Sequence, residues 1–167
     1  MELNRRRYLA VAGAIVGGGL AGCSSIPGGG GGPEYESDQK EEMLLSVDAF
    51  PDGWVRNDEI NDNFDAGFTN GDESIIVLTS VEIFDEISGA EDRMETARAG
   101  VSDPNDYPLA DEAFWATQND EFAATLFRHS NGVGQSAAVK ESGREVVPDQ
   151  QRSQEYAETM YERWQDL

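Results

Sequence analysis

Residues 64–83 read FDAGFTNGDESIIVLTSVEI and carry an Asn-Gly dipeptide at Asn70-Gly71. Asn-Gly favours a two-residue type I′ turn between antiparallel strands, because both turn positions need positive φ. The pairs that follow from such a turn are Phe68 with Glu73, Ala66 with Ile75, and Phe64 with Val77. The same face continues at every second residue through Thr79, Val81 and Ile83. This face is almost wholly apolar, so the stretch predicts a β-hairpin with one buried side.

A second Asn-Gly, at Asn131-Gly132, lies between two further alternating segments. A two-residue turn there pairs Leu126 with Ala137 and Ala124 with Val139. Another turn, at Asn119-Asp120, would set Trp115 opposite Ala124 on the same face. Large and small side chains then alternate, as a filled interior prefers. We therefore expect a three-stranded meander with strands near residues 110–118, 121–130 and 133–140.

Two segments place apolar residues at helical spacing. The first comprises Ile87, Ala90, Met94 and Ala97 and ends before Gly100; the second follows Pro148-Asp149 and comprises Tyr156, Ala157, Met160, Tyr161 and Trp164. Upstream of the hairpin, FPDGW at residues 50–54 predicts a type I turn with Pro51 second and Gly53 fourth. The expected fold class is α+β, an antiparallel sheet of hairpins and a meander with two helices packed on it.

The chain of 167 residues has 33 acidic and 12 basic residues and a formal charge of −21. Only two of the basic residues, Lys40 and Lys140, are lysines. Aromatic and β-branched residues recur from residue 43 onward, which favours one folded domain over disorder. Such an acid-rich, lysine-poor composition resembles proteins of salt-loving archaea, because molar salt shortens the Debye length to about 3 Å and screens crowded carboxylates. The charge excludes a nucleic-acid partner, which requires a basic surface.

The first residues read MELNRRRYLAVAGAIVGGGLAGC, a basic cluster followed by a short apolar run and small residues. The apolar run is too short to span a bilayer, which takes about 20 residues. The layout is that of a secretory signal. Arg5 and Arg6, followed after one residue by Tyr8 and Leu9, resemble the twin-arginine export motif, with Asn4 where that motif has Ser or Thr. Residues 1–22 are therefore expected to be a twin-arginine signal peptide.

Cys23 is the only cysteine and ends the sequence Leu20-Ala21-Gly22-Cys23, which resembles the lipobox of exported lipoproteins. The resemblance implies that the thiol of Cys23 carries a diacylglyceryl group and that Cys23 becomes the first residue. A redox role is not expected, because no second thiol exists to resolve it. Cleavage before Cys23 leaves 9 basic and 32 acidic residues, a charge of −23. Two acyl chains anchor a protein durably, whereas one binds marginally.

Residues 23–42 are expected to form a flexible acidic tether, since five glycines at 28–32 stand between Pro27 and Pro33. The globular domain would then comprise residues 43–167, at the extracellular face of the cell membrane. Its element order, with FPDGW near the start and the Arg128-x-x-Asn131 step, is similar to PsbP-like α/β/α domains and related extracellular sensor domains.

No catalytic or metal site is expected. His129 is the only histidine, and neither Ser130 nor Ser136 lies in a nucleophile elbow. Hairpin register puts His129 at a strand end, partly exposed, on a less apolar face with Phe127 and Thr125. Zinc is excluded because one histidine and one lipidated cysteine cannot supply its ligands. A calcium-loop pattern formed by Asn61, Asn63, Asp65, Thr69 and Asp72 lacks both the sixth-position glycine and the final glutamate. No cofactor is expected.

Trp54, Trp115 and Arg128 are the residues that a ligand cleft would use, although such aromatics more often belong to a core. Arg128 either pairs with local acids, which we expect, or binds an anionic ligand. The sequence predicts a lipid-anchored, surface-displayed, non-catalytic domain that acts as a binding, sensing or assembly-accessory module. Its expected partners are membrane lipid, through Cys23, and an unidentified protein or small molecule. The alternatives are a small-molecule-binding lipoprotein serving a transporter, or a hydrolase.

Overall fold

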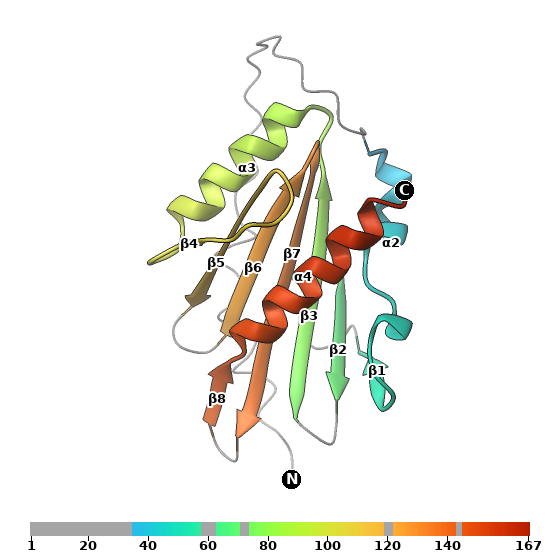
Figure 1. The fold of residues 1–167 in the computed structure, drawn as a ribbon, viewed down its shortest axis with the longest axis vertical. Helices are drawn as coiled ribbons and strands as arrows, with labels where there is room; N and C mark the ends of the chain where they lie inside the picture. The colour runs from blue at the N-terminus through green and yellow to red at the C-terminus, as the bar shows by residue number, and fades with distance from the viewer. Residues whose placement is uncertain (1–34, 58–62, 71–73, 119–121, 143–144) are drawn as a thin grey trace.

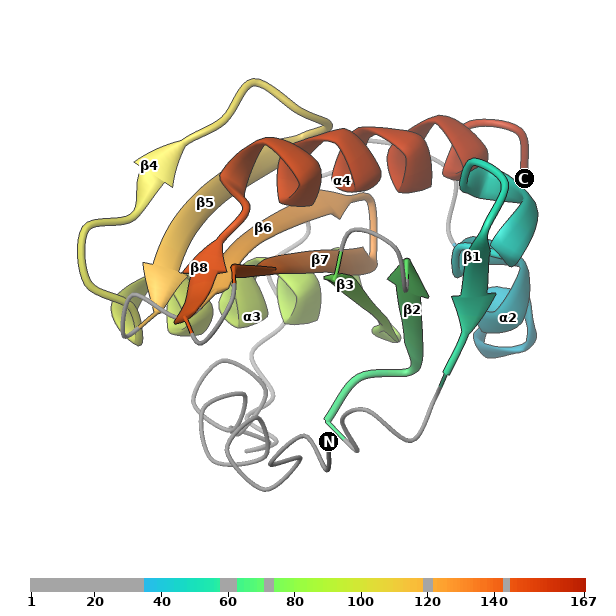
Figure 2. The same ribbon diagram turned by 90° about the horizontal axis from the view of Figure 1, so that it is seen from below.

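The structure is a computed structural model and describes residues 35–57, 63–70, 74–118, 122–142 and 145–167. These residues form one antiparallel sheet with helices on both faces, so the α+β class is confirmed (Figures 1 and 2). The strands are β1 (Trp54–Arg56), β2 (Ala66–Asn70), β3 (Ile75–Ile83), β4 (Asn105–Asp106), β5 (Glu112–Gln118), β6 (Phe122–His129), β7 (Gly132–Ser142) and β8 (Glu145–Pro148). The helical segments are η2 (Ser37–Gln39), α2 (Lys40–Met43), η3 (Val47–Ala49), α3 (Ile87–Ala99) and α4 (Gln150–Trp164).

The central strand of the sheet is β7, which joins the hairpin to the meander. The strand order is β1-β2-β3-β7-β6-β5-β4, and β8 also pairs with β7. β3 and β7 pair along their whole shared length, from Ile75 with Lys140 to Ile83 with Gly132. Turn chemistry predicts pairing only between neighbours in the chain, so this long-range pairing was not predicted.

The β2–β3 hairpin has the expected faces but a different register. Phe68 pairs with Val77, whereas a two-residue turn would pair it with Glu73, and Asn70 pairs with Ile75. The predicted register is therefore wrong by four residues along β3. An even shift leaves every side chain on its predicted face. The buried set on that face is Ala66, Phe68, Ile75, Val77, Thr79 and Val81, as expected. Phe64 instead joins the cluster on the other face of the sheet. Residues 71–73 lie outside the described part of the chain.

The β6–β7 register is also displaced by an even number. Ala124 pairs with Ala137, and His129 with Gly132, so Ser130 and Asn131 form the turn rather than Asn131 and Gly132. Ser130 accordingly takes the positive φ, +53°. The shared face of Ala124, Leu126, Ala137 and Val139 is confirmed because the shift is of two residues.

The β5–β6 register differs by one residue, and this changes which side chain is buried. Trp115 pairs with Thr125 and Phe114 with Leu126, so the expected pairing of Trp115 with Ala124 is wrong. An odd shift turns each β5 side chain to the opposite face. Phe114 therefore occupies the buried position that the sequence predicted for Trp115. The expected turn residues Asn119 and Asp120 lie outside the described residues.

Each face of the sheet is covered by one long helix (Figure 2). On the α4 face, Tyr156, Ala157, Met160 and Trp164 pack against the hairpin strands and Phe127. On the α3 face, Ala90, Met94 and Ala97 pack on Phe114, Leu126 and their neighbours. α3 ends at Ala99, after which the Gly100 N–H donates to the carbonyls of Thr96 and Ala97. Asp149 caps α4 by accepting a hydrogen bond from the Arg152 N–H at 3.1 Å. Both predicted helices are confirmed.

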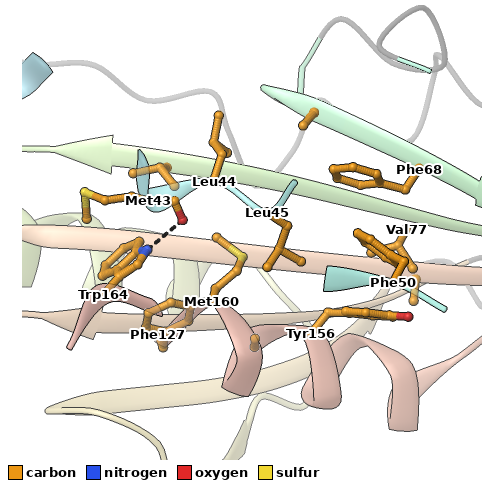
Figure 3. Packing of buried hydrophobic residues seen from close by; sticks show 14 of the residues in the cluster. Met43, Leu44, Leu45, Phe50, Phe68, Val77, Phe127, Tyr156, Met160 and Trp164 are labelled. Carbon is orange, nitrogen blue, oxygen red and sulfur yellow. Dashed lines mark hydrogen bonds between the residues drawn. The ribbon is translucent and has the colours of Figure 1, made fainter. Parts of the chain in front are cut away.

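The residues expected to end the tether belong to the domain. Tyr35 is 4% exposed, and Met43, Leu44 and Leu45 are buried in the core on the α4 face. The indole N–H of Trp164 donates to the Met43 carbonyl at 2.8 Å, which joins this segment to the last turn of α4 (Figure 3). The prediction that the domain begins at residue 43 is therefore wrong, because residues 35–42 are already part of the fold.

The FPDGW segment turns the chain into β1 and supplies a stacked aromatic group. The Phe50 ring centroid lies 4.3 Å from Phe68, 4.4 Å from Tyr156 and 4.8 Å from Trp54. The turn is centred on Asp52 and Gly53, and Gly53 has φ +94°. Glycine is thus needed at a central turn position, and the predicted type I turn with Gly53 fourth is wrong.

Candidate functional site

The three residues proposed for a ligand cleft do not meet. Trp54 lies in edge strand β1 and is buried between Phe50 and Tyr156. Trp115 and Arg128 are in neighbouring strands, but Trp115 pairs with Thr125, three residues from Arg128. Because side chains alternate along a strand, Trp115 and Arg128 lie on opposite faces of the sheet. They cannot line one cleft, so this prediction is corrected.

Polar side chains gather instead where β6 ends and turns into β7. We call Tyr35, Asp111, Arg128, His129, Ser130 and Asn131 the turn cluster. The Asp111 N–H donates to the Arg128 carbonyl at 3.0 Å, which holds Asp111 beside the end of β6. Its Oδ2 accepts the Ser130 N–H at 2.8 Å and lies 3.3 Å from His129 Nδ1 and 3.5 Å from Arg128 Nη1. One carboxylate therefore serves three consecutive residues.

The turn cluster combines unusual backbone conformations with buried polar atoms that lack partners. Ala110, next to Asp111, has φ +55°, and Ser130 has φ +53°. Residues other than glycine rarely adopt this region, and such conformations collect at functional sites. Within the described structure, Arg128 Nε, His129 Nδ1 and Ser130 Oγ are buried and make no hydrogen bond. Buried polar atoms are normally paired. Thr79 Oγ1, Gln135 Nε2 and Ser136 Oγ also lack partners in the described sheet, but the backbone there is ordinary, so we take the turn cluster, where both features coincide, as the candidate site.

Arg128 is surrounded by carboxylates, as expected. Its side chain is 13% exposed and lies 3.5 Å from Asp111, 3.9 Å from Glu112 and 3.9 Å from Glu91 of α3. The acids around the guanidinium thus come from the start of β5 and from α3. The expected pairing of Arg128 with local acids is therefore confirmed.

His129, Ser130 and Asp111 do not form a catalytic triad. A triad requires the serine hydroxyl to hydrogen-bond the imidazole. Ser130 Oγ has no such bond, and the Oγ of Ser136 also lacks a partner among the described residues. His129 is 17% exposed, which agrees with the partly exposed position expected. His129 shares its face with Phe127 and Thr125, as expected, and this face also holds the buried hydroxyls of Ser136 and Ser153 beneath α4.

Asp65, the acidic residue of the calcium-loop pattern that the structure describes, has other partners. Asp65 Oδ1 lies 2.7 Å from Lys40 Nζ, and its Oδ2 accepts the Val81 N–H at 2.9 Å. Asn61 and Asp72 lie outside the described residues. Among the residues that are described, no group of three or more His, Cys, Asp or Glu side chains could hold a metal ion.

Asn131 locks the start of the domain to the turn. Its Oδ1 accepts the Tyr35 N–H at 2.8 Å, and its Nδ2 donates to the carbonyls of Tyr35 at 2.9 Å and Phe84 at 2.7 Å. The Tyr35 hydroxyl donates to the Trp164 carbonyl at 3.2 Å. A single buried amide therefore joins the first described residue, the exit of β3 and the β6–β7 turn. The sequence analysis used Asn131 as a turn residue and as part of the Arg128-x-x-Asn131 step, so this role was missed.

Burial raises the pKa of Tyr35 to about 12, and nearby Tyr161 and Asp111 add to the shift. The unfolded state, with an ordinary tyrosine pKa of 10.0, loses this proton first. The stability that the protonated, buried Tyr35 hydroxyl contributes to the folded state is therefore fully present below pH 10 and is lost as the pH rises toward 12. We expect the free energy of unfolding to fall less steeply with rising pH in Tyr35→Phe than in the wild type. Some of the fall should remain, because burial also raises the pKa of Tyr107 and Tyr156. Denaturant titrations between about pH 9 and 12 test this, and an unchanged slope would count against it.

Comparisons with protein-family models, curated proteins and solved structures found no significant match for the chain. In the part of the chain that the structure describes, no helix combines the length and apolar character needed to cross a membrane.

Proposed function

We propose that this protein is a lipid-anchored domain displayed on the outer face of the cell membrane, where it acts without catalysis as a binding, sensing or assembly-accessory module. The observation that carries the proposal is the sequence Leu20-Ala21-Gly22-Cys23, set between the Arg5-Arg6-x-Tyr8-Leu9 motif and a glycine run. Only twelve positions beyond Cys23, Tyr35 is already fixed in the fold. Anchor, short tether and folded body therefore follow one another along the chain.

The packing of the domain supports this division of roles. Among the described residues, which begin at Tyr35, hydrophobic clusters fill both faces of the sheet. A twin-arginine-like signal implies export of cargo that is already folded, and a domain with a core on each face of its sheet suits that route. The sole cysteine is then available for lipidation, since the fold uses no disulfide.

A binding or assembly role is favoured over hydrolysis by the chemistry of the turn cluster. The only histidine faces a carboxylate but has no hydrogen-bonded nucleophile. The arginine of the cluster is occupied by acids. We also propose a PsbP-like relationship for the domain; it is supported by the helices on both faces of the antiparallel sheet and by the Arg128-x-x-Asn131 step at the β6–β7 turn.

The anchor is tested by Cys23→Ser. We expect the wild-type protein to sediment with membranes and to enter the detergent phase after extraction, because two acyl chains dominate its partitioning. The variant should leave the membrane fraction and stay in the aqueous phase. Ser24→Ala, which leaves the thiol in place, is the matched control and should behave as wild type. Detergent-phase partitioning by Cys23→Ser equal to that of wild type would contradict lipidation.

A further inference from the structure

The contacts of Tyr35 fix the place where the tether leaves the domain. Asn131 binds both the N–H and the carbonyl of Tyr35, and the Tyr35 ring packs edge-on against Trp164 with centroids 5.5 Å apart. These partners come from the β6–β7 turn and the end of α4. All lie at one end of the sheet, beside the C-terminus in Figure 1. The chain cannot swing about Tyr35 without breaking these bonds.

The opposite end of the sheet is defined by the strand pairing. β3 runs from Ile75, paired with Lys140, to Ile83, paired with Gly132 next to the turn cluster. Trp54 pairs with Asn70, and Asn70 with Ile75, so the exposed Asp52-Gly53 turn lies at the end away from Tyr35. Eight steps along an antiparallel strand separate the two ends by about 27 Å.

The length of chain between lipid and domain is comparable to this separation. For a glycine-rich sequence, the twelve positions from Cys23 to Tyr35 correspond to a root-mean-square reach of about 20 Å. Fully extended, the same chain spans about 40 Å. If the Asp52-Gly53 end faced the lipid, the tether would have to extend along the full length of the domain to reach the membrane. Such extension removes most of the conformations of the tether. The short tether therefore favours one orientation.

We propose that the domain stands on the membrane with the turn cluster and the α4 C-terminus toward the lipid, and presents the Asp52-Gly53 turn and the edge strand β1 outward. This inference rests on the proposed lipid anchor. It assigns the displayed surface to the end at which Val55, the most exposed of the large apolar side chains in the described chain, is found.

Charge sets how closely the proximal end approaches an anionic lipid surface. The segments that meet at Tyr35 carry two basic side chains, Arg163 and Lys40, and eight exposed acids: Glu36, Asp38, Glu41, Glu42, Asp85, Glu86, Glu162 and Asp166. Arg163 already donates to the Glu42 carbonyl at 2.6 Å and to Ser46 Oγ at 3.0 Å. Repulsion from anionic lipid acts over about 10 Å at 0.1 M salt and over about 3 Å at 1 M. The proximal end should thus move closer to anionic lipid as salt rises.

Energy transfer from the domain to the bilayer tests the orientation. Because the natural chain has one cysteine and it is lipidated, Asp166→Cys and Asp52→Cys each create one labelling site, both at exposed aspartates at opposite ends. The full lipidated chain is reconstituted in phosphatidylglycerol vesicles that contain an acceptor dye in the headgroup layer. We expect about twofold more transfer at position 166 than at 52, given a reach near 20 Å. Inserting twelve extra glycines into the run at 28–32 should reduce the contrast.

The outcomes separate the orientation from the anchor. Protein that floats with the vesicles and gives equal transfer at both positions, or more at position 52, overturns the orientation and leaves the anchor standing. Protein that does not float with the vesicles overturns the anchor and the orientation together. In neutral vesicles the difference in energy transfer between positions 166 and 52 should persist, because this difference originates in the length of the tether. It should not depend on salt, since the lipid then carries no net charge.

Discussion

Replacing Trp164 with alanine is expected to lower the free energy of unfolding by about 4–5 kcal/mol, near the upper end for a large core side chain. The indole is 1% exposed and lies beside Met43 and Phe127 in the cluster on the α4 face (Figure 3). It fills space that two glycines leave: a Cβ at Gly132 would come within 3.0 Å of Trp164 Cζ3, and one at Gly134 within 3.1 Å of Cη2. Gly134 also lies so close to the Phe127 ring that a Cβ would overlap it.

The loss would include more than apolar area. Trp164→Ala also leaves the Met43 carbonyl without its donor and removes the ring against which Tyr35 packs. Denaturant unfolding at molar salt measures the change, with Trp115→Ala as the matched control. Trp115 is half-buried in β5, so its removal should cost about 1–2 kcal/mol. Equal losses for the two variants would show that Trp164 does not hold the start of the domain to α4.

Asn131→Ala is expected to cost about 3–4 kcal/mol, because three backbone groups lose their partners at once. These groups are the N–H and carbonyl of Tyr35 and the carbonyl of Phe84. Removing one side of a buried hydrogen bond costs the desolvation of the group left behind, so the effect exceeds that of three exposed bonds. The segment from Tyr35 to Met43 should then open before the sheet does.

Hydrogen exchange and a control variant test whether Asn131 holds the Tyr35 segment in place. Hydrogen exchange in Asn131→Ala should rise first at the backbone amides of Tyr35 and Phe84, whose N–H donates to the Asn131 carbonyl. Asn105→Ala is the control: its Nδ2 donates only to the exposed Asp103 carbonyl, so the stability should change by less than about 1 kcal/mol. Unchanged protection at Tyr35 in Asn131→Ala would rule out the locking role.

The sequence was sufficient to predict the faces of two hairpins but not their registers. At Asn70-Gly71 and Asn131-Gly132 the true pairing is displaced by four and two residues, and an even displacement keeps each side chain on its face. At β5–β6 a displacement of one residue exchanged Trp115 for Phe114. Alternating hydrophobicity cannot determine the length of a turn when both candidates, as here, are large aromatic residues.

The candidate site was largely invisible in the sequence. Tyr35 and Asn131 are separated by 96 positions, and the pairing of β3 with β7 is what brings the Phe84 carbonyl to the same amide. Asn131 precedes a glycine, so its role in locking the fold was hidden by its turn propensity. Arg128 was predicted to pair with acids, because cations are scarce in this chain, and Asp111, Glu112 and Glu91 confirm it. The acids themselves could not be chosen from 33 candidates.

Intact-mass and peptide analysis of the protein purified from membranes tests the central claim most directly. We predict a mature chain that begins at Cys23, with the mass of a diacylglyceryl thioether on its sulfur and no peptide from residues 1–22. A chain that retains Met1 and a free thiol at position 23 would contradict the anchor and every proposal built on it.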